Sequence, residues 1–459
     1  MRGRFGKRFF IIIAIVGDLI AVNIGVLLAL WLGSGCNLLA EDLQLYMKVS
    51  LFISLYTVLI FTVLGLYIYK ERTKVAFLYN LSLGVVAIFF MSIALVHSLG
   101  GKNIPLIAPL LQLLFVFTWR IALRRLLSAL LKVKHIILIA HNDDIPRLVG
   151  KFLTYSFFKI ELVKTYNENE ITALMGNRSI FQDIDGLCID SRIETELRRR
   201  LVKRAIDEDI ELYLVPDFYD VFSQNVSYDK AEDLPLFYMR RFRLSLFSRW
   251  LKRGFDIVVS LLCLILGIPL FLFIILMVRL SSSGPIFYIQ ERIGLNGRSF
   301  NLIKFRTMID GAEDETGPVV AQKDDSRITR VGKGLRAVRL DELPQIINVL
   351  KGEMSLVGPR PERPIFVERF IKEIPGYEYR FRVRPGLTGL AQVEGDYNTN
   401  IKDKLIYDLL YIQNYSFLLD IEIILKTFSV PFFPEKAEGR NNKRAEGVVE
   451  VASTHDKGL

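Results

Sequence analysis

The chain has few of the residues that build metal centres and disulfide frameworks. Its 459 residues include only three cysteines and four histidines. Cys36, Cys188 and Cys263 are far apart, and two of them lie in apolar surroundings. This spacing fits neither a paired disulfide framework nor a zinc site, and the histidines form no metal-binding pattern. We therefore expect no structural metal and no disulfide.

Hydrophobic residues, in contrast, are abundant. They make up 51% of the chain, and the mean hydropathy is +0.32, which exceeds the values of ordinary soluble proteins and predicts membrane segments. The length suggests about three domains. The net charge of +10 suits nucleic acid, an anionic membrane face or a phosphorylated substrate.

Four apolar runs fill the first quarter of the chain, at residues 9–32, 46–69, 75–99 and 104–123. Each approaches the roughly 20 residues that a helix needs to cross about 30 Å of hydrocarbon. A signal peptide is the alternative for the first run, but no clear cleavage site follows it and three more runs come after it. We predict four transmembrane helices within residues 1–130.

Basic residues flank these runs on one side. They are Arg2, Arg4, Lys7 and Arg8 before the first run, Lys70, Arg72 and Lys74 between the second and third, and Arg124, Arg125, Lys132 and Lys134 after the fourth. The other two loops carry Glu41 and Asp42, and Lys102 alone. The positive-inside rule therefore places both ends of the bundle in the cytoplasm.

The next segment alternates between short apolar runs and charged helical stretches. "HIILIAH", "KIELV", "GLCID" and "IELYLVP" are typical of strands, and "RIETELRRRLVKRAIDED" of an amphipathic helix. This alternation predicts a small Rossmann-like α/β domain with a mainly parallel sheet, at residues 131–243. Its first turn, "AHNDDIPRL", lacks the glycines of a dinucleotide-binding turn, so we expect a packing or regulatory role, with a homodimer through this domain as one candidate assembly.

A second hydrophobic element, residues 255–280, contains Pro269, which predicts a bend because proline cannot donate a backbone hydrogen bond. A kinked fifth membrane span and a re-entrant hairpin are the two alternatives. Both flanks are basic, so both should be cytoplasmic. Each arm, about 12 residues or about 18 Å long, reaches across one leaflet only. We favour the re-entrant hairpin, which anchors a catalytic α/β domain at residues 244–434.

Cationic side chains are frequent in that domain. In "NLIKFRTM", Lys304 and Arg306 stand two residues apart, which in a strand aims both at one face. Two cations on one face suit a diphosphate, and arginine binds two oxygens at once. A solvated strand face would have the same pattern.

Two adjacent carboxylates, Asp341 and Glu342, open a helical segment in "LDELPQIINVLKGEMSLVGPRPE". One suits a nucleophile towards phosphorus, and the other a metal ligand or a proton carrier. We expect neighbouring arginines to keep the nucleophile ionised. Acids in the first turn of a helix are also common for the dipole alone, and this reading stays open.

Two arginines lie beside prolines later in the domain. In "GPRPE", the prolines fix the backbone on either side of Arg360. In "VRPGLTG", Arg384 precedes a Pro-Gly turn in which Gly386 and Gly389 would allow a ligand to approach closely. Each motif alone could be an ordinary tight turn. Together they predict an anion pocket in which Arg360 and Arg384 bind substrate.

Residues 254–434 resemble the bacterial sugar transferases, the monotopic phosphoglycosyl transferase superfamily. The matching blocks are "KRGFDI", "GPIFYIQERIGLNGRSFNLIKFRTM", "LDELPQIINVLKGEMSLVGPRPE", "IPGYEYRFRVRPGLTGLAQVEG" and "YDLLYIQNYSFLLDIEIILKT". The whole chain is similar to the long polytopic members that initiate exopolysaccharide, capsule or O-antigen synthesis. It departs from them at Ile268 and Arg339, where the family often has serine.

The resemblance implies an enzyme of class EC 2.7.8.-, which transfers a sugar 1-phosphate from a UDP-sugar to polyprenyl (undecaprenyl) phosphate and releases UMP. It implies that Asp341 is the nucleophile, that Glu342 is its partner, and that Mg²⁺ binds at this pair. Lys304, Arg306 and Arg360 would hold phosphate or uridine. The enzyme would sit in the bacterial inner membrane, with the insert and catalytic domains in the cytoplasm.

Two other functions remain as alternatives. One is a non-catalytic membrane scaffold or regulator of polysaccharide assembly, and the other is a metal-dependent glycosyltransferase that releases UDP. We expect no nucleic-acid partner. The sequence does not identify the sugar, and residues 435–459, which are polar with mixed charge, are predicted to be disordered.

Overall fold

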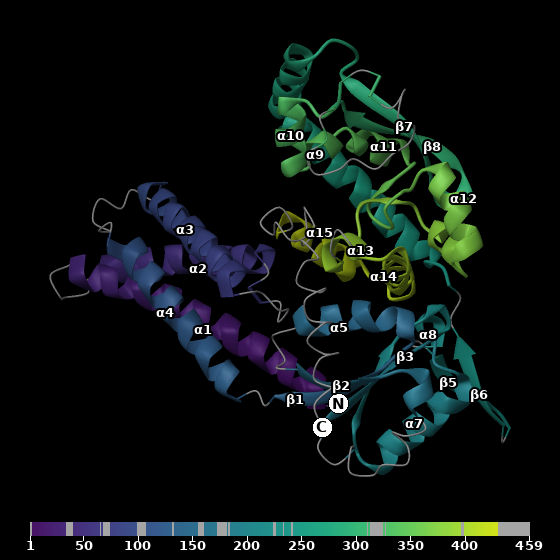
Figure 1. Cartoon of the computed structure of the whole chain (residues 1–459). Coiled ribbons are helices and arrows are strands. Elements are labelled where there is room, and N and C mark those ends of the chain that lie inside the picture. The colour runs from purple at the N-terminus through teal and green to yellow at the C-terminus, as the bar shows by residue number, and fades with distance from the viewer. Residues whose placement is uncertain are drawn as a thin grey trace. The chain divides into compact units, whose positions relative to one another are not determined.

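The computed structural model describes residues 2–33, 40–64, 66–67, 74–98, 107–130, 133–154, 160–171, 181, 184–223, 226–232, 234–239, 242–309, 311–312, 325, 327–395 and 399–429. The predicted disordered tail lies outside these residues. The chain forms two compact units, one within Met1–Val215 and the other within Pro216–Asn441 (Figure 1).

The first unit begins with four apolar helices, α1 (Arg2–Gly33), α2 (Ala40–Val63), α3 (Lys74–Ser98) and α4 (Ile107–Leu130). α1 packs along α4, and α2 and α3 complete the bundle. Phe10–Leu32 and Ile107–Leu126 are long and apolar enough to cross a membrane. α2 and α3 contain the shorter apolar stretches Tyr46–Thr62 and Asn80–Ala94. Membrane helices are therefore present, and the number of crossings stays a prediction.

A buried ion pair joins the first and last helices of this bundle. Nε of Arg120 donates to Oδ1 of Asp18 at 2.8 Å, and Nη1 of Arg120 donates to the Leu66 carbonyl at 2.9 Å. Both charged side chains are buried. Because charges inside an apolar bundle are costly unless they are paired, this contact fixes how α1 and α4 pack together.

A parallel sheet follows the bundle in the same unit. Its strands are β1 (Lys134–Ile139), β2 (Ile160–Tyr166), β3 (Gly186–Asp190) and β4 (Glu211–Val215), in the order β2-β1-β3-β4. α5 (Ile145–Thr154) packs on one face of the sheet and α7 (Thr195–Asp207) on the other. The alternating residues of β1 and β3 bury both faces, which confirms the predicted parallel α/β domain.

The second unit contains several short helices and strands around one larger and one smaller apolar core. It begins with α8 (Phe218–Ser223) and the antiparallel pair β5 (Val226–Ala231) and β6 (Leu234–Met239). The long helix α9 (Leu246–Ser281) is followed by the antiparallel pair β7 (Phe287–Ile293) and β8 (Ser299–Phe305), with η4 (Leu295–Gly297) between the two strands. The next elements are α10 (Arg330–Ala337), η5 (Leu340–Glu342), α11 (Gln345–Lys351), β9 (Ser355–Val357) and α12 (Pro364–Glu373). The described part of the unit ends with η6 (Tyr377–Arg382), β10 (Gly386–Thr388), α13 (Leu390–Glu394), α14 (Ile401–Gln413) and α15 (Phe417–Ser429).

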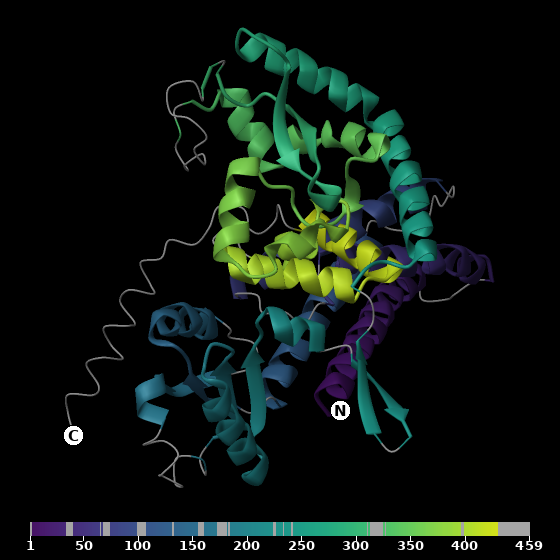
Figure 2. The same ribbon diagram turned by 90° about the vertical axis from the view of Figure 1, so that its right-hand side faces the viewer.

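Helix α9 is a single helix of 36 residues with Pro269 inside it. Figure 2 shows that its two arms meet at a bend, as expected for a proline in a helix interior. The first arm is tied to α15, because Nζ of Lys252 lies 2.7 Å from Oδ2 of Asp420. The second arm buries Ile274 and Val278 against Phe305. Both ends of α9 therefore pack on the same domain.

The middle of α9 has a different environment from its ends. Large apolar side chains there are exposed, and the exposed fraction reaches 78% at Leu266. Ile265, Ile268 and Leu272 are likewise exposed. A continuous apolar surface of this kind suits contact with lipid.

Candidate active site

The acidic pair lies on the short helix η5, directly before α11. Glu342 is buried and Asp341 is half-buried. The preceding residue, Arg339, has a left-handed backbone with φ 56° and ψ 24°. Such a conformation costs about 1 kcal/mol or more for a residue with a side chain, so the turn that presents the two acids is locally strained.

Glu342 is held by two cations from distant parts of the chain. Nη2 of Arg360 lies 2.6 Å from its Oε1, and Nζ of Lys304 lies 3.2 Å from the same oxygen. Burial by itself would raise the pKa of Glu342, but Arg360 and Lys304 outweigh it and hold that pKa well below its ordinary value. Glu342 therefore stays ionised, as a fixed counter-charge to both cations.

Asp341 is in the opposite situation. Among the described residues, its carboxylate has no hydrogen-bond or ion-pair partner. Burial raises the pKa of Asp341, and the neighbouring charge of Glu342 raises it further, although Lys304, Arg336 and Arg360 act against them. We expected neighbouring arginines to keep this nucleophile ionised. Arg336 and Arg360 do lower its pKa, but burial and Glu342 raise it more, so the net direction in the free protein is upward.

Lys304 reaches this site because β8 is fixed to α11. The side chain of Asn348 on α11 accepts a hydrogen bond from the Ile303 amide at 3.1 Å and donates to the Asn301 carbonyl at 2.7 Å. Asn348 is fully buried. These two bonds tie the strand that carries Lys304 to the helix that follows the acidic pair, and so set the distance between them.

Arg360 is held in a turn that packs against a second strand. The Gly358 amide donates to the Thr388 carbonyl at 2.8 Å, and the Gly386 amide donates to the Pro359 carbonyl at 2.9 Å. A Cβ on Gly386 would lie 2.1 Å from the Gly358 nitrogen, and one on Gly389 would lie 2.2 Å from its oxygen. The two glycines that we expected to admit a ligand thus allow two backbone segments to pack together.

The other two predicted arginines lie apart from Glu342. Arg306 follows the end of β8, and its Nη2 donates to the carbonyl and hydroxyl oxygens of Ser282, the C-cap of α9. Its Nε and Nη1 are buried and have no hydrogen-bond partner among the described residues. Nε of Arg384 donates to the Gly352 carbonyl at 2.8 Å. Gly352 is the C-cap of α11, a helix of 7 residues and therefore about 10 Å long, and the acidic pair precedes the other end of that helix.

The side chains around the acidic pair determine whether Mg²⁺ could bind there. Within the described ranges, no group of three or more His, Cys, Asp or Glu side chains is placed to hold a metal ion. Mg²⁺ commonly binds through one or two carboxylates together with substrate phosphates. The Asp341 carboxylate, which no other described side chain pairs with, fits that role, whereas the oxygens of Glu342 already face Lys304 and Arg360. The residues therefore fit an ion that is completed by the substrate.

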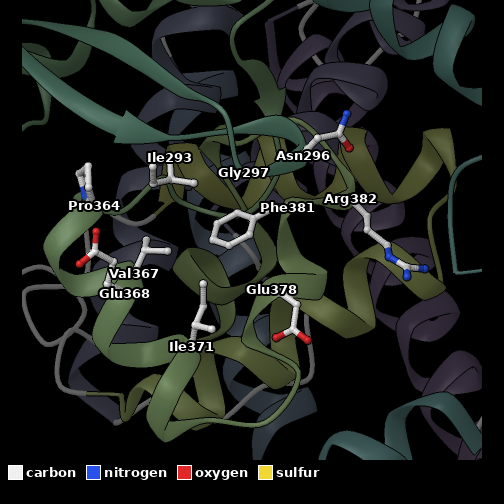
Figure 3. Close-up of a pocket in the computed structure, with 10 residues that line it drawn as sticks. All are labelled: Ile293, Asn296, Gly297, Pro364, Val367, Glu368, Ile371, Glu378, Phe381 and Arg382. Atoms are coloured by element: carbon white, nitrogen blue, oxygen red, sulfur yellow. The ribbon is translucent and has the colours of Figure 1, made fainter.

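The described part of the chain also has a pocket of about 340 Å³, which Figure 3 shows with its lining residues. Its walls come from β7, η4, α12 and η6, and none of the predicted site residues lines it. It lies beside Ile293, which pairs with Ser299, whereas Lys304 pairs with Tyr288 at the opposite end of the same hairpin. We assign no chemistry to this pocket. Its lining residues are Ile293, Asn296, Gly297, Pro364, Val367, Glu368, Ile371, Glu378, Phe381 and Arg382.

Sequence reasoning missed a buried pair behind Arg360. Arg380 and Asp408 are both buried and lie 2.8 Å apart. A signal was present, because Asp408 interrupts the apolar run "LIYDLLYI". A single acid in such a run predicts a buried partner but does not identify it.

Comparison with known proteins places this site in a family. The family model described as "Bacterial sugar transferase" matches residues 247–434. The exopolysaccharide production protein ExoY of Sinorhizobium fredii is 40% identical over 190 residues, which are 38% of this chain and 83% of that protein. The chain belongs to the bacterial sugar transferase family, as the resemblance predicted.

Two longer relatives act on different sugars, according to their names. The UDP-N-acetylgalactosamine-undecaprenyl-phosphate N-acetylgalactosaminephosphotransferase of Aeromonas hydrophila is 46% identical over 181 residues, 39% of this chain and 43% of that protein. The UDP-glucose:undecaprenyl-phosphate glucose-1-phosphate transferase of Klebsiella pneumoniae is 36% identical over 263 residues, 55% of this chain and 56% of that protein. The matched region thus spans about half the length of these relatives.

Proposed function

We propose that this protein transfers a sugar 1-phosphate from a UDP-sugar to polyprenyl phosphate and releases UMP, and thereby begins the synthesis of a surface polysaccharide. The names of two relatives support this reaction class, and the name of a third supports a role in exopolysaccharide production. One observation carries the assignment of residues. Of two adjacent acids, Glu342 is fixed between Lys304 and Arg360, while the carboxylate of Asp341 has no partner within the described part of the chain.

The reaction proceeds in two displacements at the sugar-linked phosphorus. An oxygen of Asp341 forms a bond to that phosphorus, and the bond to the oxygen bridging the two phosphates breaks, so that UMP leaves with the electron pair. An oxygen of polyprenyl phosphate then forms a bond to the same phosphorus and frees Asp341. The covalent step lets UMP depart before the lipid acceptor enters.

The cations around Glu342 suit the charge of the donor. In the free protein, Lys304 and Arg360 contact the carboxylate oxygens of Glu342. A donor diphosphate bound nearby would provide further oxygens for these two cations to bind. Glu342 keeps the two cations in place and spares them from being buried without a partner. Arg306 has two buried nitrogens that lack a partner among the described residues, so it is a further candidate for binding a phosphate oxygen. Arg384 would act farther from the chemistry.

Magnesium would bind at Asp341 together with the donor phosphates, with Glu342 beside it. When bound, the ion would offset the charge that gathers on the phosphoryl group during transfer. It would also favour the ionised form of Asp341, whose pKa is raised by burial in the free protein.

Helix α9 supplies the attachment to the membrane in this proposal. If α9 were straight, its 36 residues would extend about 54 Å, yet both of its arms pack on one domain. We propose that the apolar bend enters the cytoplasmic leaflet and returns by the same face. This arrangement would keep the catalytic domain at the level of the lipid headgroups, where polyprenyl phosphate presents its charge.

The test is to incubate membranes that contain the protein with a panel of UDP-sugars and polyprenyl phosphate, and to identify the nucleotide released. UMP supports sugar-phosphate transfer. UDP would instead indicate a glycosyltransferase that moves the sugar alone, and no nucleotide with any donor would favour the scaffold alternative. The donor that gives turnover also identifies the sugar.

A further inference from the structure

A second arginine lies directly behind Arg360. Arg380, at η6, is buried, and its guanidinium has three partners. Nη2 donates to the main-chain carbonyl of Arg360 at 2.8 Å and lies 2.8 Å from Oδ2 of Asp408. Nη1 donates to the hydroxyl of Tyr377. The arginine thus connects α14, η6 and the turn that carries Arg360.

This connection is made by a buried ion pair, although apolar side chains could fill the same space at a lower cost in free energy. Asp408 is 2% exposed and Tyr377 is fully buried. Burying an ion pair gains little stability compared with apolar residues of similar volume. A rigid guanidinium, however, fixes the direction of each of its partners. The pair is therefore better suited to setting a geometry than to strengthening the core.

The geometry in question is that of the Arg360 turn. Pro359 and Pro361 restrict the backbone on either side of Arg360, so a bond to its carbonyl fixes the point from which the side chain extends. Nη2 of that side chain lies 2.6 Å from Oε1 of Glu342. Asp408, Arg380, Arg360 and Glu342 form one continuous chain of contacts.

We propose that Arg380 and Asp408 are positioning residues for the transfer reaction, which hold the Arg360 guanidinium at Glu342 through the Arg360 carbonyl. This inference rests on the proposed function. Neither residue touches the acidic pair in the described structure, so both act through Arg360. Asp408 orients Arg380, and Arg380 orients the turn.

The test is a double-mutant cycle on UMP release, with kcat and KM measured for the parent, Asp408→Asn, Arg360→Ala and the double variant. We expect Asp408→Asn to lower kcat about 10-fold or more in the parent, because small displacements of a binding group are costly. In the Arg360→Ala background the same substitution should change kcat less than about 2-fold, since nothing is left to position. Equal fold losses in both backgrounds would overturn the proposal.

Two further variants sharpen the result. Arg380→Lys keeps the positive charge but loses the planar guanidinium that binds several partners at fixed angles. We therefore expect it to lower kcat as Asp408→Asn does and to show the same coupling to Arg360. Glu394→Gln is the matched control, since it removes one charge from the Glu394–Lys426 pair, whose atoms lie 2.9 Å apart in the same domain. We expect its kcat to stay within about 2-fold of the parent. A loss like that of Asp408→Asn would mean that any broken ion pair disturbs the enzyme.

The proposed function and the positioning role fail in different ways. If the parent releases no UMP from any donor, the proposed function is wrong. The melting temperatures of the same four proteins then replace kcat in the double-mutant cycle. Shifts from Asp408→Asn and Arg360→Ala that do not add would then support the physical connection, and additive shifts would overturn it.

Discussion

Nη2 of Arg360 lies 2.6 Å from Oε1 of Glu342, and this contact gives two adjacent acids different roles. Glu342 is buried, and it is stable as an anion because Arg360 and Lys304 face it. Asp341, one residue earlier, has no such partner among the described residues. A carboxylate that is free to react thus stands next to one that is fixed.

Asp341→Asn should abolish UMP release while leaving the protein folded and bound to the membrane. Asparagine has nearly the same volume but no nucleophilic carboxylate, so we expect a loss of at least about 10³-fold. Because Asp341 makes no described hydrogen bond, the melting temperature should barely change. Steady-state assays and thermal unfolding of the same preparation test this, and full activity in the variant would end the mechanism proposed here.

Glu342→Gln should damage the fold more than Asp341→Asn does. It leaves Lys304 and Arg360 next to a neutral group, and breaking a buried pair costs several kcal/mol. Arg360 keeps 40% of its side chain exposed, so water compensates in part and we expect about 2–3 kcal/mol. Thermal unfolding of both variants shows which has the lower melting temperature. The prediction is contradicted if Asp341→Asn melts at the lower temperature.

Chelation should stop turnover, and Mg²⁺ should restore it. If Asp341 is a ligand, the ion together with UDP should raise the melting temperature of the parent, because a ligand that binds the folded state stabilises it. The shift should shrink in Asp341→Asn and persist in the control Glu394→Gln. An undiminished shift in Asp341→Asn would place the ion elsewhere.

The end of α9 gives a test of membrane topology. Ser283 is exposed just after the helix, so a cysteine in its place should react with an impermeant thiol reagent. In a background without Cys36, Cys188 and Cys263, we expect labelling from the cytoplasmic side only. Labelling from the opposite side would mean that α9 crosses the bilayer and would exclude the hairpin.

The stability of the catalytic domain should depend on pH through Asp408. Burial raises the pKa of Asp408 to about 6, and Glu362 raises it too, against the effects of Arg380 and Lys404. In the unfolded chain this pKa is about 4. Between these two values the folded protein binds more protons than the unfolded chain, so Asp408 makes the free energy of unfolding fall as the pH rises from about 4 to 6.

Asp408→Asn should remove this contribution, because asparagine does not titrate. The melting temperature of the parent should therefore fall relative to that of Asp408→Asn as the pH increases through this window. A difference between the two proteins that stays constant from about pH 4 to 7 would show that Asp408 does not titrate there.

Much of this protein follows from local sequence. Long apolar runs predict membrane helices, because the length and composition of a run are enough to show whether a helix could cross the bilayer. The alternation of apolar strands and charged helices predicts a parallel sheet, which β1 to β4 confirm. The adjacent acids and the proline-bound Arg360 are also visible in the sequence, since each motif lies within a few residues.

The tertiary structure alone decided which of these groups meet. Lys304 and Arg360 lie 38 and 18 residues from Glu342, and both contact that acid rather than its neighbour. Arg384 and Arg306 instead contact the ends of helices α11 and α9. Residue type and spacing fix the local backbone, but the direction of a long side chain depends on packing between segments far apart in the chain. That packing sets the difference between Asp341 and Glu342.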